Sequence, residues 1–320
     1  MDLIYMNANK EDVGVMQDYA FDLAFGMDEN DFECSVVRGK HCCEAGFYLY
    51  LEGSEYGGII DDLGIDTEAD EITYYGRTWH GLLNSKIIEP DAGEDYLILS
   101  GEANSVLGAL ITRLGLTTLF KASSDASGIT VSNYKMNRYI AGYDGIRKML
   151  KASGAKLHIA FKNGFAELSA KPIIDYSEDE QFDADQIAFK IKKKGSPLNH
   201  VICLGKGDLA EREVIHLYAD KNGNISDAQV FFGVDEVAVT YDNSNAESEE
   251  LRQGGIDRIT ESWNSDEIEF DFESDSESYD VGDIVGAREN VTGIEVCAEI
   301  TKKIVSISNN TTTISYKVGE

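Results

Sequence analysis

Residues 58–75 read GIIDDLGIDTEADEITYY and contain the pattern that decides the fold. Apolar and polar positions alternate as far as Ile65, a polar segment at 68–70 interrupts them, and the alternation returns at Ile72 and Tyr74. A period of two with β-branched and aromatic residues is typical of a strand with one buried face. Two such runs separated by a short polar segment predict a hairpin, so this stretch indicates antiparallel β-structure.

Short strands of the same kind are expected throughout the chain. They lie at residues 34–37, 47–51, 199–205, 212–218, 281–286, 294–307 and 312–318. Two further runs, 156–161 and 165–170, flank Lys162-Asn163-Gly164, and an Asn-Gly turn between apolar runs is the strongest short-range hairpin signal. The chain is therefore expected to be β-rich.

Helices are expected mainly in the middle of the chain. Apolar residues recur at helical spacing over 106–114, and Gly115 follows as a C-terminal cap. A second helix is expected over 143–152, where Gly154 ends the pattern, and a short third helix over 246–261.

These signals predict a β-rich α+β fold with two small β-barrel domains and an inserted helix-plus-hairpin domain. A chain of 320 residues is longer than one typical domain. The expected division is a first β-barrel domain at 1–96, an α+β insertion domain at 97–184, and a second β-barrel domain with a short helix at 185–320. The second boundary follows Pro172, in an acidic and weakly patterned stretch at 173–184.

The charge balance bears on the choice of partners. The chain has 58 Asp and Glu residues against 28 Lys and Arg, a net charge of −30, which repels phosphate backbones and anionic membranes. The basic run at 190–194 is interpreted as a solvated strand end. No stretch approaches the ~20 consecutive apolar residues of a membrane span, so no membrane insertion is expected.

The first residues and the cysteines indicate the compartment. The opening MDLIY lacks the basic region and apolar run of a secretory signal. Five cysteines without a regular spacing favour reduced thiols, and no disulfide is predicted. We therefore expect the chain to be made and assembled in a cytoplasm.

The common signatures of catalysis and metal binding are absent from the sequence. It contains no Gly-Lys-Ser/Thr phosphate loop, no His-Glu-x-x-His and no Gly-x-Ser-x-Gly. The segment Gly53–Gly57 is interpreted as a hairpin turn, and His41-Cys42-Cys43 lacks the second ligand pair of a zinc site. Residues Asp220–Asn224 resemble a calcium loop only in part and indicate a turn. No catalytic, cofactor-binding or metal-binding residue is predicted, and no cofactor.

Titratable residues do occur in suggestive positions. Carboxylate pairs such as Asp61-Asp62, Asp183 with Asp185, and Glu249-Glu250 are interpreted as solvated faces of an acidic chain. His158 and His216 fall inside expected strands and are interpreted as packed, hydrogen-bonded histidines.

Residues 71–88, EITYYGRTWHGLLNSKII, are the most distinctive in the chain. They combine a strand, Gly-Arg, a small residue, Leu-Leu and an Ile pair, and this pattern resembles tail baseplate hub proteins of long-tailed phages and prophages. Residues 13–19 with 31–34 are similar to the opening of that family, and 58–61 are similar to its next hairpin, in the same order. Later segments similar to its second barrel are 218–220, 281–285, 298–301 and 316–319.

The resemblance implies a hub at the distal end of the tail tube. In that family two barrel-like domains per subunit let a homotrimer present pseudo-sixfold symmetry to a hexameric tube. The implied partners are the tail tube, distal tail proteins, the tape-measure protein and other baseplate subunits, with DNA passing the pore without specific binding. The implied location is the virion tail, assembled in the bacterial host cytoplasm. An acidic chain suits such a channel because carboxylates repel phosphates.

The function expected from the sequence is therefore structural, and the protein is not expected to be an enzyme. An alternative is a host-surface, carbohydrate-binding tail module, and a third is a tail-associated peptidase or cell-wall hydrolase. Tyr75, Arg77 and Trp79 are candidates for subunit contacts, because aromatic and Arg residues dominate interface energetics, or else for the strand core.

Overall fold

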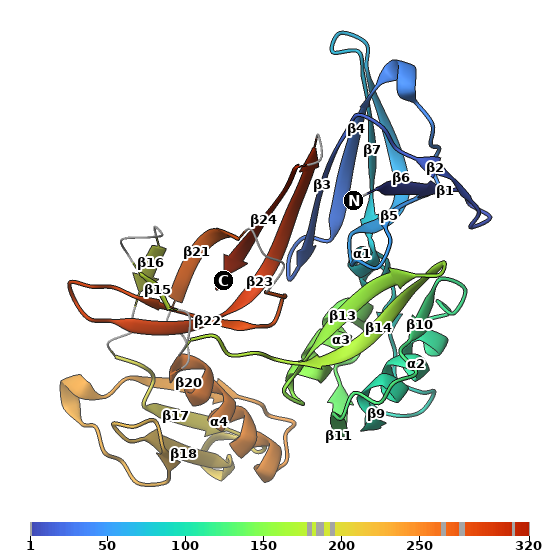
Figure 1. Cartoon of the computed structure of the whole chain (residues 1–320). Helices are drawn as coiled ribbons and strands as arrows, with labels where there is room; N and C mark the ends of the chain where they lie inside the picture. The colour runs from blue at the N-terminus through green and yellow to red at the C-terminus, as the bar shows by residue number, and fades with distance from the viewer. Residues whose placement is uncertain are drawn as a thin grey trace. The chain divides into compact units, whose positions relative to one another are not determined.

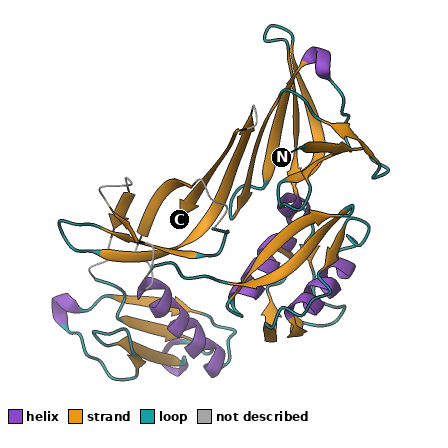
Figure 2. Ribbon diagram, viewed as in Figure 1, coloured by secondary structure: helices purple, strands orange, loops and turns teal. Residues whose placement is uncertain are grey.

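A computed structural model describes residues 2–177, 181–183, 189–192, 196–263, 267–274, 279–308 and 311–319. The chain divides into two compact units, one formed by Met1–Phe189 with Phe270–Glu320 and the other by Lys190–Glu269. Strands predominate in both, with a few helices between them (Figures 1 and 2). None of the helices in the described ranges is both long and apolar enough to cross a membrane.

One continuous sheet contains the strands from both ends of the first unit, together with the residues at which the chain passes into and out of the second unit. Its strands follow in the order β16 (Phe189–Lys192), β21 (Glu267–Ser274), β24 (Thr311–Val318), β23 (Glu295–Ser308), β3 (Tyr19–Gly26), β4 (Asp31–Val37), β7 (Glu71–Thr78), β6 (Gly57–Asp66), β5 (Tyr48–Leu51), β1 (Leu3–Met6) and β2 (Asp12–Val15). Strand β22 (Ile284–Arg288) also pairs with β23, and β15 (Gln181–Asp183) pairs with β22. The β-rich prediction is confirmed. The two closed barrels are not, because over the described residues the strand order is open from β16 to β2.

Strands from the two ends of the chain meet at the centre of this sheet. Strand β3 pairs antiparallel with β23, from Gly26 opposite Lys302 to Ala20 opposite Ser308 (Figure 1). A Cβ atom on Gly26 would lie 2.2 Å from the carbonyl oxygen of Thr301, so only glycine fits here. The joint between the N-terminal and C-terminal strands is therefore tightly packed.

Side chains alternate between the two faces of the sheet. One face is apolar and buried, and its members on β3, β4, β7 and β23 are Phe21, Leu23, Phe25, Phe32, Cys34, Val36, Ile72, Tyr74, Val305 and Ile307. The hairpin expected over 58–75 is confirmed as β6 and β7. In its turn the Asp66 carboxylate accepts hydrogen bonds from the backbone N–H groups of Glu68 and Ala69 at 2.8 and 2.9 Å.

An α+β segment follows β7. Its elements are α1 (Trp79–Asn84), β8 (Ile87–Ile88), β9 (Leu97–Glu102), α2 (Ala103–Arg113), β10 (Phe120–Ala122), β11 (Thr130–Met136), β12 (Ile140–Ala141), α3 (Gly142–Lys151), β13 (Ala155–Lys162) and β14 (Phe165–Pro172). The two helices expected here are confirmed as α2 and α3. Asn163 and Gly164 have φ of 52° and 76°, which the expected two-residue hairpin turn between β13 and β14 requires.

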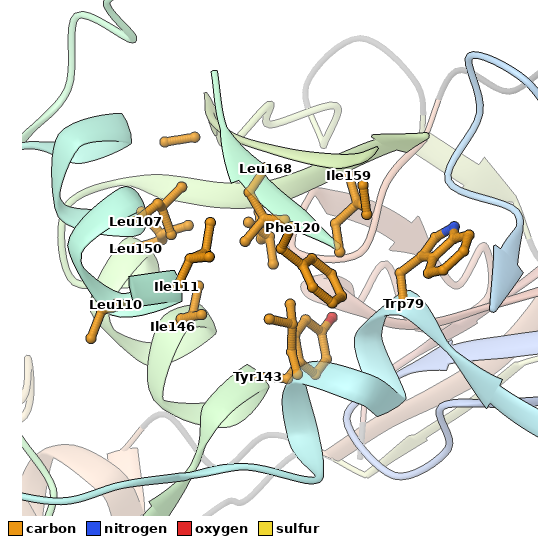
Figure 3. Close-up of a cluster of buried hydrophobic side chains, with 14 of the residues drawn as sticks. Trp79, Leu107, Leu110, Ile111, Phe120, Tyr143, Ile146, Leu150, Ile159 and Leu168 are labelled. Atoms are coloured by element: carbon orange, nitrogen blue, oxygen red, sulfur yellow. The ribbon is translucent and has the colours of Figure 1, made fainter. Parts of the chain in front are cut away.

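The core of this segment lies between its two longer helices and the β13–β14 hairpin (Figure 3). Its fully buried members include Leu107, Leu110 and Ile111 of α2, Ile146 and Leu150 of α3, Phe120, Ile159 and Leu168. Trp79 of α1 stacks on Phe161 with ring centroids 4.8 Å apart and an interplanar angle of 8°. The helices thus bury the apolar positions whose spacing predicted them.

The second unit is a four-stranded sheet with a helix on one face. The strand order is β19 (Ile225–Ser226), β18 (Val214–Ala219), β17 (His200–Leu204) and β20 (Ala238–Asp242), and the third expected helix is confirmed as α4 (Ser248–Trp263). Its core contains Val201, Cys203, Leu217, Ala219, Ala246, Leu251 and Ile259. A Cβ atom on Gly255 would lie 2.4 Å from the Cys203 sulfur, so glycine lets α4 approach the sheet closely.

Single-turn 3-10 helices complete the described structure, at Arg38–Lys40, Leu209–Glu211 and Gly233–Asp235. Parts of three predictions fall outside the described residues: positions 178–180 and 184 of the expected domain connection, Asp185 of a carboxylate pair, and Lys193 and Lys194 of the basic run.

The joint between β3 and β23 gives a first prediction. Gly26→Ala forces a methyl group against Thr301 and Lys302, and it should lower the free energy of unfolding of the first unit by about 1–3 kcal/mol. The matched control is Gly39→Ala, because a Cβ atom there meets nothing within 4 Å, and its effect should stay within about 0.5 kcal/mol.

Denaturant unfolding of both variants can be followed unit by unit. The chain has 2 tryptophans, one in each unit, so a Trp263→Phe background leaves Trp79 as the reporter of the first unit. Equal effects of the two glycine substitutions would contradict the tight joint.

Candidate functional site

The polar face of the central sheet is the candidate site. Asp22 of β3, Glu33 of β4 and Tyr75 of β7 lie side by side, because Asp22 pairs with Glu33 and Glu33 with Tyr75. Asp31 stands two positions before Glu33 and shares its face, and Glu29 lies in the preceding turn. We call these five residues the acidic face.

The surface is hollowed at the acidic face. The hollow has a volume of about 400 Å³, and the residues that line it besides the acidic face are Leu23, Ala24, Phe32, Gly76 and Ile304. A Cβ atom on Gly76 would lie 2.6 Å from the Phe32 ring, so this glycine lets the ring pass beneath the strand. The site is therefore a shallow acidic concavity on a rigid sheet.

The neighbouring basic side chains are already neutralised. Lys302 donates to Glu29 at 2.7 Å and contacts Asp28 at 2.8 Å. Arg77 binds Asp61 with both Nε and Nη2, each at 2.7 Å. Within the described ranges, no ion pair forms to the remaining three carboxylates, those of Asp22, Asp31 and Glu33. The face thus keeps its negative charge.

Two pKa shifts follow from this arrangement. The hydrogen bond from Lys302 lowers the pKa of Asp28, whereas burial, followed by the nearby charge of Glu29, raises the pKa of Asp31. Burial is the larger cause of the rise in the pKa of Asp31, and the charge of Lys302 opposes it.

Behind the sheet lies a buried ionic cluster. Lys303 is 2% exposed, and its Nζ lies 2.9 Å from Glu55 and 3.8 Å from Asp280. Lys156 of β13 contacts Asp280 at 2.7 Å and the wholly buried Asp283 at 2.6 Å. Four segments distant in the sequence are joined here through paired charges.

The charges in this cluster compensate the cost of their burial. Burial acts to lower the pKa of Lys303, but Glu55, Tyr56, Tyr316 and Asp280 together outweigh it and the pKa is raised. Burial acts to raise the pKa of Asp280, but Lys156, followed by Lys303, outweighs it and the pKa is lowered. Both groups therefore remain charged inside the protein.

Three ligand atoms of the cluster could approach a metal ion. Oxygen or nitrogen atoms of Glu55, His158 and Asp280 lie within 4.8 Å of one another. Both carboxylates are already neutralised by Lys303 and Lys156, whose ammonium groups would repel a cation. The arrangement fits ion pairs better than a resident metal.

The three residues proposed as subunit contacts differ in their exposure to solvent. Tyr75 is 43% exposed on the acidic face, and Arg77 lies on the same strand face, paired with Asp61. Trp79 is fully buried, so it belongs to the core and is not available as a subunit contact.

The other singled-out motifs are local structure. In Gly53–Gly57, Ser54 Oγ donates to the Leu51 carbonyl at 2.9 Å, as in a turn. The Asp220 carboxylate accepts hydrogen bonds from the Asn224 side chain at 3.0 Å and from the backbone N–H groups of Asn222 and Asn224 at 2.8 and 3.0 Å. The side-chain hydrogen bond, followed by the two backbone hydrogen bonds, lowers the pKa of Asp220.

The His-Cys-Cys motif lies against a buried tyrosine. The sulfurs of Cys42 and Cys43 are 3.7 Å apart, and His41 Nδ1 is 3.0 Å from the Tyr74 hydroxyl. All five cysteines of the chain are free. His158 lies beside the ionic cluster. His216 lies within a strand and its Nδ1 is 2.9 Å from His200 Nε2, as predicted, although its side chain is exposed.

No family model matches the sequence, and no curated protein matches it. Solved structures do match over nearly the whole chain. The prophage tail protein gp18 from Listeria monocytogenes EGD-e is 12% identical with a TM-score of 0.55, covering 99% of this chain and 94% of that one. The prophage MuSo2 43 kDa tail protein from Shewanella oneidensis is 11% identical with a TM-score of 0.58, covering 99% and 98%.

A third match is the tail protein from Neisseria meningitidis MC58, 11% identical with a TM-score of 0.52, covering 100% of this chain and 96% of that one. The chain shares its fold with these tail proteins. More particularly, two of these three structures are prophage tail proteins, and the resemblance noted from the sequence is confirmed at the level of the fold.

The ionic cluster gives a second prediction. Lys303→Met leaves Glu55 buried without its partner and should lower the free energy of unfolding of the first unit by about 3–5 kcal/mol. Adding Glu55→Gln should recover part of that loss. The control is Lys40→Met, which removes an exposed pair with Asp18 and should cost less than about 1 kcal/mol. Equal losses in the single variants, measured by denaturant unfolding, would refute a buried pair.

A third prediction concerns His80. This residue is 2% exposed, it stacks on Phe25 at 4.3 Å, and its Nδ1 finds no hydrogen-bond partner among the described residues. Burial, followed by the nearby His158 and Lys303, lowers its pKa to about 3. Between that value and the unfolded pKa of about 6.5, the unfolded chain binds more protons, so stability is lost as the pH falls through this window.

His80→Phe should therefore weaken the acid dependence of unfolding between about pH 6.5 and 3. The matched control is His41→Phe, at an exposed histidine of the same unit, and it should leave the slope unchanged. Unfolding free energies at several pH values measure both slopes. An unaltered slope in the His80 variant would refute the role assigned to this residue.

Proposed function

We propose that this protein is a structural baseplate hub of a phage or prophage tail, which forms a ring at the distal end of the tail tube and lines the channel with its acidic face. The observation that carries the proposal is the row of unpaired carboxylates at Asp22, Asp31 and Glu33. It stands on a sheet whose opposite face is buried.

The physical argument concerns how DNA passes a protein channel. DNA carries one negative charge per ~1.7 Å of helix axis, so a basic lining would hold it in place. A lining of carboxylates repels the phosphates and leaves the DNA free to slide. At physiological salt this repulsion acts over about 8 Å. The net charge of −30 makes the rest of the chain equally unsuited to holding DNA.

The two halves of the sheet support a trimeric ring with pseudo-sixfold symmetry. We infer that β1–β7 and β21–β24 act as two tube-like domains within the division 1–96, 97–184 and 185–320. Three subunits would then offer six such domains to a hexameric tube. Val13 and Val15 on the terminal strand β2 are 51% and 41% exposed, and an open strand edge of this kind suits pairing with a neighbouring subunit.

The remaining partners follow from the same proposal. They are the tail tube, distal tail proteins, other baseplate subunits and the tape-measure protein, and the location is the virion tail after assembly in the host cytoplasm. The fold shared with prophage tail proteins supports this assignment. A structural role also accounts for the paired, inward-facing charges of the ionic cluster without any chemistry.

One observation favours the carbohydrate-binding alternative. Tyr75 exposes 43% of its surface inside the acidic hollow, where an aromatic ring among carboxylates could stack on a sugar. Affinity for cell-wall glycans that is lost in Tyr75→Ala would favour this second function. Cleavage of peptides or peptidoglycan would favour the tail-associated hydrolase.

The test is the solution mass measured by light scattering over a range of protein and salt concentrations. A trimer that forms more readily as salt rises is expected, because salt screens the acidic faces that the ring brings together. Asp22→Asn with Glu33→Gln should shift trimer formation to lower salt. The matched control, Glu249→Gln with Glu250→Gln on α4, should not. A monomer under every condition, with the two double variants alike, would contradict the hub.

A further inference from the structure

Two histidines face each other on the open side of the sheet in the second unit. His200 of β17 and His216 of β18 lie on the face opposite Val201 and Leu217, which α4 covers. His200 Nε2 lies 2.9 Å from His216 Nδ1. His200 is nearly buried, whereas His216 is exposed. Burial therefore restricts the His200 ring, whereas the exposed His216 ring can change its orientation.

A carboxylate fixes the protonation of the buried histidine. Glu236 Oε1 lies 2.6 Å from His200 Nδ1 and also accepts from Gln229 Nε2 at 3.1 Å. An ionised carboxylate only accepts hydrogen bonds, so Nδ1 of His200 carries the hydrogen. The lone pair of His200 Nε2 is then directed at His216. This is the arrangement by which a carboxylate orients a metal-bound histidine in proteins.

We propose that His200 Nε2 and His216 Nδ1 bind a transition-metal ion such as Zn²⁺. With Zn–N bonds of about 2.0–2.1 Å, two tetrahedral nitrogen ligands stand about 3.3 Å apart. The pair therefore has to open by only a few tenths of an ångström, which the exposed ring of His216 permits. On binding, the hydrogen of His216 Nδ1 moves to its Nε2, so the imidazole stays neutral.

The Tyr218 side chain stands beside the pair and offers the ion a neutral hydroxyl oxygen. The Tyr218 hydroxyl lies 3.4 Å from His216 Nδ1, and its ring stacks on His200 with centroids 4.3 Å apart. Water or a carboxylate from a partner can fill the remaining position, since the site opens to solvent. The site is independent of the proposed hub function, because it lies wholly within Lys190–Glu269.

The test titrates the full chain with Zn²⁺ by calorimetry and with Co²⁺ by absorption. Binding of one ion that depends on His216 is expected, with cobalt d–d bands and no thiolate-to-cobalt charge-transfer band. His216→Gln should weaken Zn²⁺ binding at least tenfold, and Glu236→Gln by about 10–100-fold. His216 is exposed, and an unchanged melting temperature of the metal-free variant shows that it folds.

The matched controls are His41→Gln and Cys297→Ser, at an exposed histidine and an exposed thiol outside the second unit. Both should bind Zn²⁺ as the original chain does. The proposal is overturned by any of three results: no binding of Zn²⁺, binding that His216→Gln leaves unchanged, or cobalt spectra that show thiolate ligands.

Discussion

The register between β3 and β23 is the constraint on which the rest of the structure depends. It places Lys302 opposite Gly26 and Lys303 opposite Phe25, so two consecutive lysines point to opposite faces of the sheet. Lys302 neutralises Glu29 of the acidic face, and Lys303 enters the buried ionic cluster. A slip of one residue would exchange the two and leave a buried charge without its partner.

The buried ionic cluster joins the β3–β23 pair to parts of the first unit that are distant in the sequence. Because an unpaired ammonium group inside a protein costs several kcal/mol, the burial of Lys303 requires Glu55 to be delivered by the turn before β6. Asp280 then connects Lys303 to Lys156, and so the sheet to the β13–β14 hairpin. The charges of the ionic cluster are paired on the buried side of the sheet. On the other side, the carboxylates of Asp22, Asp31 and Glu33 can contact solvent or, in the proposed ring, the contents of a channel.

Local structure could be predicted from the sequence because its causes are local. The hairpins at 58–75 and 156–170 follow from alternation and turn residues, and the helices over 106–114 and 143–152 follow from apolar spacing. The pairing of β3 with β23 and the contact between Lys303 and Glu55, 248 residues apart, have no such signal. The net charge shows that the chain is acidic, but it does not indicate that Asp22, Asp31 and Glu33 lie close together. Their proximity depends on the register of separate strands. The two β-barrels were expected from the strand pattern as well as from the resemblance, and they are not confirmed because the strand order is open over the described residues.

The central claim is that the acidic face lines a channel, and an electron cryomicroscopy reconstruction of the assembled ring tests it most directly. The account predicts a trimer in which Asp22, Asp31 and Glu33 of every subunit face the central lumen, with Lys303 buried away from it. A ring in which these carboxylates lie on the outer surface, or are covered by a subunit contact, would contradict the account.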